Sequence, residues 1–126
     1  MNFTIPVKPR TKKNHSQLVT LRNGRQIMLP SKAYKEFEEE IENWYEISDK
    51  EIKQLHITKP INLKCIFYKD KNFKSDLSGY LQAIQDALVH VGMIEDDNHY
   101  IIQSLDGSRV FLDRENPRIE VEITYV

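Results

Sequence analysis

The chain has 126 residues, of which 40% are hydrophobic and 29% charged, and its net charge is -1; this is the size and composition of one globular domain with a single hydrophobic core. No apolar run approaches the ~20 residues of a membrane-spanning helix, and the N-terminus lacks the apolar stretch of a signal peptide, so we expect neither. The single cysteine, Cys65, excludes a disulfide framework and a cysteine-rich zinc site, and it favours a cytoplasmic protein.

The first third of the chain predicts a strand, a hairpin and a helix. A short strand is expected over residues 3–7. Asn23-Gly24 separates two alternating runs, residues 17–21 and 25–29, and this dipeptide in such a setting is the strongest short signal for a β-hairpin. Ser31 can cap a helix, which we expect to end near Ser48. The buried stripe of that helix recurs at helical spacing and consists of Tyr34, Phe37, Ile41 and Trp44.

The middle of the chain predicts a half-buried strand and a second helix. Residues 49–59 are ambiguous and are compatible with one more helical turn. Residues 61–68 alternate as a strand, in which Cys65 is expected to be a core thiol and not a nucleophile. A helix is predicted over residues 77–91, with Gly92 as its stop. Its apolar stripe consists of Leu77, Tyr80, Leu81, Ile84, Ala87, Leu88 and Val91.

The last third of the chain predicts strands only, over residues 100–105, 109–112 and 118–126, with Asp106-Gly107 as a turn. These elements indicate an α+β fold. We expect one domain over residues 1–126, with a mixed sheet of five or six strands, mostly joined by hairpins, and two main helices on one face. The segment 61–100 is the one expected strand–helix–strand crossover.

The charges are distributed unevenly along the chain. Residues 1–35 contain lysines and arginines but no acid, whereas residues 36–51 are dominated by glutamate and aspartate. A basic block of this kind is a candidate surface for binding phosphates. The alternative is that the basic segment pairs with the acidic helix inside the molecule, and charge alone does not decide between the two.

Four aspartates accompany the second predicted helix. Asp76 stands at its start, Asp86 lies on its polar face, and Asp96 and Asp97 follow its glycine stop. Carboxylates are the ligands preferred by a hard cation such as Mg²⁺, and such an ion can activate water for phosphodiester hydrolysis. The alternative interpretation is a solvated helix followed by an acidic loop.

The segment from Lys74 to Asp97 resembles the core of the RusA family of Holliday junction resolvases. That family carries Asp-Leu-Asp-Asn, a Lys four residues after the second Asp, then Asp-Ala-Leu and a closing Asp-Asp. Asp76 matches the first acid, and the two later motifs match Asp86-Ala87-Leu88 and Asp96-Asp97. Three flanking segments are similar to phage-type members: residues 11–14, 30–34 and 106–110.

Three positions depart from the family pattern. The second Asp of the family falls on Ser78, its Asn on Gly79 and its Lys on Gln82. Asp76 is therefore the one carboxylate left in the first acidic motif. Gly79 costs about 1 kcal/mol relative to alanine in a helix, and it either permits the close approach of a backbone or is simply tolerated.

The resemblance implies an α+β domain of RusA type that hydrolyses phosphodiesters in four-way DNA junctions, in recombination and repair. It implies Mg²⁺ or Mn²⁺ bound by Asp76 and Asp97, with Asp96 assisting; for Asp86, direct ligation and a supporting role remain open. A helix of about fifteen residues is roughly 22 Å long, so either the chain after Met93 folds back along it or carboxylates from two subunits meet. A junction with two strands to cut fits a homodimer.

Lysines are the candidates for contacts with the DNA backbone, namely Lys12, Lys13, Lys69, Lys71 and Lys74. Lys74 also lies close enough in sequence to Asp76 to supply the charge missing at Gln82. Two other functions compete with the junction nuclease. The losses at Ser78 and Gln82 fit a junction-binding protein with weakened or lost cleavage, and a protein-interaction module would make the Asp-Asp pair only a turn.

Overall fold

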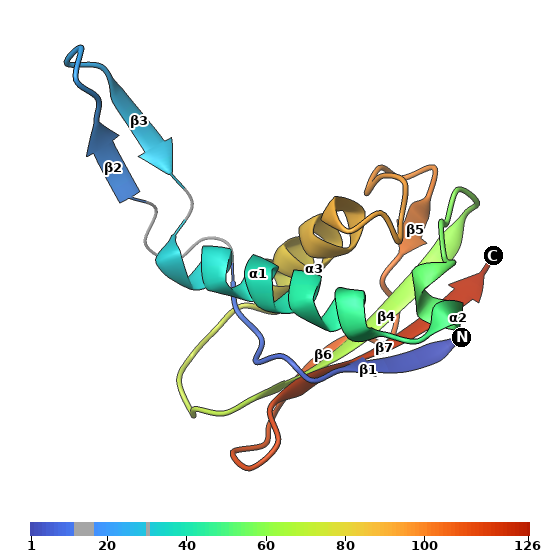
Figure 1. Cartoon of the computed structure of the whole chain (residues 1–126). Helices are drawn as coiled ribbons and strands as arrows, with labels where there is room; N and C mark the ends of the chain where they lie inside the picture. Colours follow the sequence, from blue (N-terminus) through green and yellow to red (C-terminus); the bar gives the residue numbers. More distant parts are fainter. Residues whose placement is uncertain (12–16, 30) are drawn as a thin grey trace.

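The structure is a computed structural model that describes residues 1–11, 17–29 and 31–126. Two sheets and three helices make up its described part (Figure 1). In chain order the elements are β1 (Asn2–Ile5), β2 (Gln17–Thr20), β3 (Gln26–Leu29), α1 (Lys32–Ile47), α2 (Lys50–Lys53), β4 (Ile61–Lys69), α3 (Leu77–His90), β5 (Ile102–Ser104), β6 (Arg109–Leu112) and β7 (Arg118–Tyr125). The predicted α+β fold class and the two main helices are confirmed.

The main sheet has five strands and is mixed, as the sequence predicted. Its order is β1-β7-β4-β5, and β6 also pairs with β4. The strand β7 runs antiparallel to both of its neighbours, with Val121 opposite Phe3 of β1 and Cys65 of β4. The crossover expected over residues 61–100 is present, because β4 and β5 pair in parallel on either side of α3.

The connections between the strands differ from the expectation that hairpins would dominate. Both β5 and β6 lie parallel to β4, β5 along its start and β6 along its end. The turn at Asp106-Gly107 therefore joins two strands that pair with successive parts of β4 and does not form a hairpin. Side chains hold that turn. Asn62 Oδ1 accepts from the N–H of Asp106 at 2.9 Å, and Ser108 Oγ accepts from the N–H of Cys65 at 3.0 Å. Among the described strands, β2 and β3 form the one hairpin.

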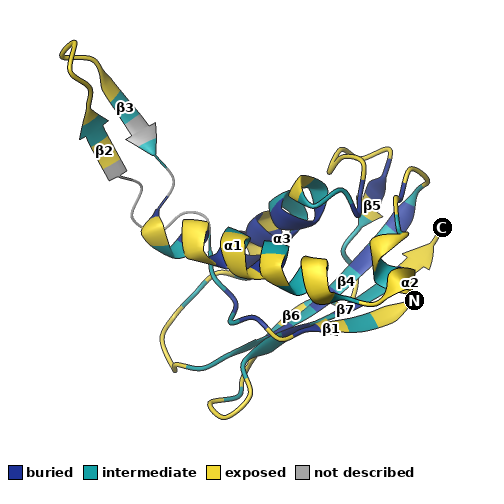
Figure 2. Cartoon of the chain, in the orientation of Figure 1, coloured by how far each residue is buried: buried dark blue, intermediate teal, exposed yellow. Residues whose placement is uncertain are grey.

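The helices α1 and α3 cover one face of the main sheet and enclose the core (Figures 1 and 2). The odd-numbered residues of β4, from Ile61 to Phe67, are buried, which confirms the alternation read from the sequence. Burial raises the pKa of the Cys65 thiol to about 12, so this cysteine is an inert core residue. Residues of α3 contribute most of the helical core: Tyr80, Leu81, Ala83, Ile84, Ala87 and Leu88.

The small hairpin of β2 and β3 projects away from the main sheet (Figure 1). Gly24 has a φ of 82°, which is the conformation that the Asn-Gly turn requires. Asn23 Oδ1 accepts from the N–H of Arg25 at 2.9 Å and completes the turn. The hairpin therefore forms where the sequence predicted it, one residue shorter in each strand.

The ambiguous segment 49–59 contains the short helix α2 and a bridge that matters for the candidate site. Asp49 caps α2 through its side chain. Ile57 then forms an isolated parallel bridge with Ile94, the residue that follows Met93 after the end of α3. Other boundaries differ from the predicted ones by at most two residues. No helix in the described part of the chain is long and apolar enough to cross a membrane.

Candidate active site

Asp76 lies at the N-cap of α3 and is exposed. Its φ of -96° and ψ of 129° are the extended conformation of a cap, and its carbonyl oxygen accepts from the N–H of Gly79 at 3.1 Å. The side chain, however, makes no capping hydrogen bond. An aspartate at this position usually satisfies a backbone N–H of the first turn. The carboxylate of Asp76 is thus exposed and not used for capping.

Gly79 allows the N-terminal segment to pack against the first turn of α3. A Cβ at this buried glycine would lie 3.1 Å from both Cβ and Cγ2 of Thr11, which is tighter than ordinary van der Waals contact. The open question about Gly79 is therefore answered by a close approach, of a side chain and not of a backbone. Lys12 and Lys13, which follow Thr11, lie outside the described residues.

Asp86 lies in the second half of α3, where its neighbours come from two helices. Gln82 Nε2 donates to both carboxylate oxygens of Asp86 at 3.3 Å. The phenol of Tyr34 on α1 faces the same region: burial raises its pKa, and the negative charges of Asp86 and Glu38 raise it further. The charge of Asp86 thus reaches the interface between α1 and α3, where Glu38 adds a second negative charge.

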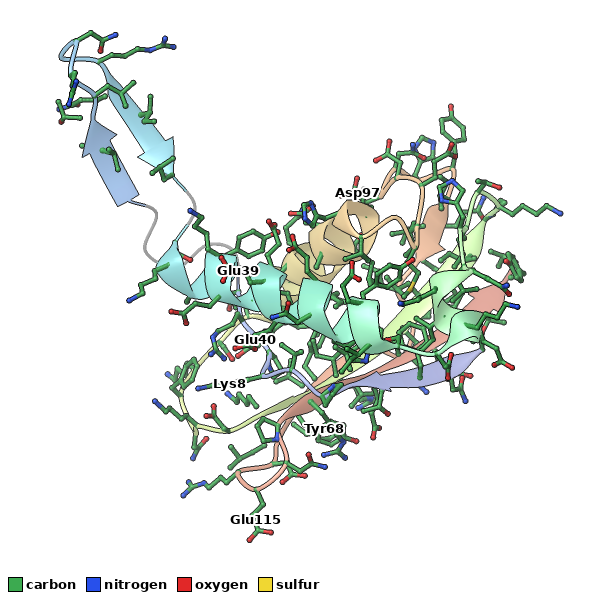
Figure 3. The ribbon with its side chains drawn as sticks, viewed as in Figure 1. Lys8, Glu39, Glu40, Tyr68, Asp97 and Glu115 are labelled. Carbon is green, nitrogen blue, oxygen red and sulfur yellow. The ribbon has the colours of Figure 1, made fainter. Side chains whose placement is uncertain are left out.

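The chain folds back after α3 and carries Asp96 and Asp97 with it. Gly92 has a φ of 86°, Met93 and Ile94 are buried, and the bridge to Ile57 holds the returning segment. Figure 3 shows Asp97 beside the C-terminal half of α3. The fold-back left open by the sequence is therefore present, but it brings Asp97 to the C-terminal half of α3 and not to Asp76 at the N-cap.

Asp96 and Asp97 have opposite electrostatic environments. The N–H of Asp97 donates to Asp96 Oδ1 at 2.8 Å and Asn98 Nδ2 donates to Oδ2 at 3.1 Å; these bonds hold the pKa of Asp96 below its usual value. The pKa of Asp97 is raised, first by burial and then by its hydrogen bond with Asp96 and the charge of Asp86. Asp96 organises the loop, and Asp97 is repelled by the negative charges of Asp86 and Asp96.

The Asp86 and Asp97 carboxylates fit a hard cation in their donor chemistry. Both present oxygen atoms, and each carries a negative charge that disfavours the other. A cation placed between two such groups removes the repulsion and leaves both ionised. The residues present therefore match a Mg²⁺-type ion at the C-terminal half of α3.

The four predicted acids do not form one group within a single chain. Asp76 precedes Asp86 by ten residues of helix, which is roughly 15 Å along the axis. In the described part of the chain, the one set of three carboxylate or histidine ligands within 4.8 Å of one another is Glu38, Glu42 and His90. The structure thus brings Asp97 toward Asp86 but leaves Asp76 at the other end of α3.

Two basic segments meet around a hollow near the start of α3. Lys8 and Arg10 from the segment after β1, and Lys69 and Lys71 from the end of β4 and the following loop, line a cavity of about 390 Å³. Lys8 forms an ion pair with Asp70 at 2.8 Å. The ammonium group of Lys69 donates to the carbonyl oxygen of Phe73 and to Ser75 Oγ, so this lysine also holds its own loop together.

The comparison with known families decides the identity of the chain. Residues 6–124 match the family described as Endodeoxyribonuclease RusA. The chain belongs to the RusA family. It is a Holliday junction endodeoxyribonuclease of DNA recombination, in a family whose nucleases are generally metal-dependent. A search of curated proteins found no match. The RusA assignment excludes the interaction module considered above.

Two of the three departures from the RusA pattern lie in one row on α3, together with Asp86. Ser78, Gln82 and Asp86 are spaced four residues apart, so their side chains follow one another along one face of the helix. Gln82, at the position of the family's lysine, is the residue that hydrogen-bonds Asp86. A neutral amide thus replaces a cation beside the most negative part of the site.

The positions of several residues around the candidate site were not predicted from the sequence. Tyr34 was predicted only as core, and His90 was not placed near α1, yet His90 Nε2 lies 2.5 Å from Glu42 Oε1. The one available signal was the Glu38/Glu42 pair at helical spacing, because it marks a continuous acidic face. Nothing in the sequence indicates that this face would meet the last turn of α3.

Proposed function

We propose that this RusA-family nuclease cleaves four-way DNA junctions with Mg²⁺ or Mn²⁺ held at the C-terminal half of α3. Asp97 and Asp86 are the proposed ligands, with Asp96 assisting through the loop that it organises. The observation that carries this proposal is the fold-back after α3, in which the buried Met93 and Ile94 and the bridge to Ile57 hold Asp97 beside the C-terminal half of the helix. The raised pKa of Asp97, caused by burial and then by Asp96 and Asp86, agrees with this arrangement. Ionised carboxylates that repel each other are stabilised by a bound cation.

The residues of the chain have distinct tasks in this proposal. Asp96, fixed by the N–H of Asp97 and by Asn98, sets the direction of the Asp97 side chain. Gln82 orients the carboxylate of Asp86 from one turn earlier. When bound, the ion would polarise the phosphoryl oxygens and lower the pKa of the attacking water. The family's general metal dependence supports a bound ion.

Asp76 remains a proposed ligand, and its position favours a homodimer. Its carboxylate makes no capping bond, yet it lies roughly 15 Å along the helix axis from Asp86. A second subunit related by a two-fold axis brings another set of acids to the same substrate, and a four-way junction has two strands to cut symmetrically. We therefore infer a homodimer.

The basic hollow is the proposed surface for the DNA backbone. Lysines and arginines from residues 8–10 and 69–71 surround it, and Lys71 and Lys74 are exposed nearby in sequence. Among the described residues, no cation of residues 1–35 pairs with an acid of α1, and Lys8 pairs instead with Asp70 (Lys8 is labelled in Figure 3). This supports a role of the basic segment outside the molecule. The predicted contacts by Lys12 and Lys13 belong to the same proposal.

We further infer that residues 1–126 act as one RusA-like endonuclease domain of phage type in a reducing compartment such as the cytoplasm. One core cluster contains residues from Ile5 to Ile123, which supports a single domain. The free and buried Cys65 fits a reducing environment. The similarity of residues 106–110 to phage-type members supports the proposed type.

Weakened cleavage is the second candidate, and the row on α3 favours it. Ser78 adds no charge where the family has an acid, and Gln82 adds none where it has a lysine. Both losses leave binding of the junction intact and lower the stabilisation of the developing charge during hydrolysis.

The test is cleavage of a synthetic four-way junction by the full chain, first with Mg²⁺ and then with Mn²⁺. Asp97→Asn should abolish cleavage and keep junction binding, since the isosteric amide removes one charge that repels phosphate. Asp106→Asn, in the turn after β5, is the matched control and should cleave normally. Normal cleavage by Asp97→Asn would exclude it as a ligand, and binding without cleavage by the unmodified chain would establish the second candidate.

A further inference from the structure

Two glutamates of α1 face a histidine of α3 across the interface of the two helices. Glu38 and Glu42 are one helical turn apart, and each has a carboxylate oxygen near His90 Nε2, at 3.9 Å and 2.5 Å respectively. One ligand atom of each residue lies within 4.8 Å of the other two. Three ligand atoms at such separations can surround a single ion.

The chemistry of this trio differs from that of the aspartates. Mg²⁺ and Ca²⁺ select sites made of oxygen atoms alone, whereas an imidazole nitrogen with carboxylates suits the first-row transition metals, and Zn²⁺ in particular. We propose that Glu38, Glu42 and His90 bind a divalent transition-metal ion, best matched by Zn²⁺, that joins α1 to α3. Three protein ligands leave a fourth position of a tetrahedral ion for water.

The surroundings of the trio favour a cation. His90 belongs to the last turn of α3, where the helix dipole stabilises positive charge. A hollow of about 250 Å³ lies alongside, lined by Glu42 and His90 together with Glu46 and Asn43, so an ion and its water can enter from solvent. The side chains of Glu38, Glu42 and His90 keep relative exposures of 34%, 45% and 47%. An ion there is reached without opening the core.

A simple ion pair between His90 and Glu42 is the competing explanation of the geometry. It explains the 2.5 Å contact and leaves Glu38 as a long ion pair at 3.9 Å, with a hydrogen bond to Tyr34 as well. A metal ion would bind both glutamates equally, because it takes one oxygen from each and the nitrogen lone pair from the imidazole. The two explanations differ in what Co²⁺ does when it is added.

The experiment uses the full chain, stripped of metal, and Co²⁺ as the probe for Zn²⁺. We expect one equivalent of Co²⁺ to give the visible absorption of a low-symmetry site, to be displaced by Zn²⁺, and to raise the melting temperature. His90→Ala and Glu42→Gln should each weaken binding at least about tenfold, since even the outer partners of metal ligands cost that much. The nearly isosteric Glu42→Gln keeps the test valid if His90→Ala folds poorly.

Two control variants separate this site from the rest of the protein. Glu39→Gln with Glu40→Gln removes two charges from α1 outside the trio (both residues are labelled in Figure 3), and Asp97→Asn removes the proposed Mg²⁺ ligand; both should retain the Co²⁺ signal. The proposal is overturned if Co²⁺ keeps the spectrum of the hydrated ion, or if Glu42→Gln binds within twofold of the unmodified chain. An equal loss of Co²⁺ binding in the control variants would also overturn the proposal. This outcome does not depend on whether the protein cleaves junctions.

Discussion

Replacing Asp97 by asparagine should stabilise the metal-free protein. Because burial, the bond with Asp96 and the Asp86 charge raise the pKa of Asp97 in the folded chain, folding disfavours its ionised form. The folded state then holds the proton more tightly, so stability falls as the pH rises from the ordinary aspartate pKa of 3.8 through the raised pKa. At pH 7 the whole cost is present, and asparagine removes it without changing the shape of the side chain.

The size of this gain follows from the exposure of the residue. Asp97 is largely exposed and the burial that raises its pKa is only partial, so screening by water limits the gain to below about 1 kcal/mol, which is about 4 °C in melting temperature for a chain of this size. Mg²⁺ should reverse the order of stability of the native chain and the Asp97→Asn variant. With about 10 mM Mg²⁺ and an assumed Kd of about 1 mM, binding stabilises the native chain by about 1.4 kcal/mol. The variant, without the Asp97 carboxylate, should not gain this stabilisation.

The measurement is thermal unfolding at pH 7, first with a chelator and then with Mg²⁺. The variant should melt higher than the native chain without metal and lower with it. Asp106→Asn is the control, since no side-chain hydrogen bond among the described residues links Asp106 to the candidate site, and it should stay within about 0.5 kcal/mol under both conditions. A less stable metal-free variant would refute the electrostatic argument. Equal stabilisation of both proteins by Mg²⁺ would show that Asp97 is not a ligand.

Three further changes test other parts of the molecule. Ser78→Asp restores the family's acid in the first turn of α3, where the helix dipole favours it by about 0.3–1 kcal/mol; it should tighten Mg²⁺ binding and raise cleavage at low Mg²⁺, and an unchanged rate would refute the motif-loss argument. Lys71→Ala with Lys74→Ala should lower the slope of log affinity against log salt by about one unit for each lost phosphate contact, whereas an unchanged slope would place the DNA elsewhere. Gly92→Ala should cost about 1–2 kcal/mol in urea unfolding, because its φ of 86° is strained for a side chain; a neutral effect would contradict this.

The sequence predicted the elements whose signals are local. The Asn23-Gly24 turn, the alternation of β4 and the apolar stripe of α3 are each contained within a few residues, and all three are confirmed. The pairing of β5 and β6 was not predictable in this way. An Asp-Gly turn indicates that the chain bends, but the direction depends on hydrogen bonds to β4, about forty residues earlier in the sequence, such as the one from the N–H of Cys65 to Ser108.

The candidate site was predictable in composition but not in geometry. The four aspartates were identified from spacing and resemblance, and their roles stay predictions. That Asp97 approaches Asp86 depends on the bridge between Ile57 and Ile94, and Ile57 lies in the segment that the sequence left ambiguous. The distance between Asp76 and Asp86, in contrast, follows directly from the length of the helix.

The distribution of charge along α3 decides how these observations fit together. Residues 78, 82, 86 and 90 form one row on the helix, and in this chain the first two are neutral. All the charge of the row is at its C-terminal half, where Asp86 is joined by Asp97 and where His90 meets the glutamates of α1. The charge that the family places at the first turn is therefore absent there, whereas the opposite end carries more acids than one bound ion needs. Cations should accumulate at that end, and Asp76 then needs a second subunit to take part in the same chemistry. If metal instead binds first at Asp76, the charges of residues 78, 82, 86 and 90 do not decide where the ion binds. The losses of charge at Ser78 and Gln82 are then not important for activity.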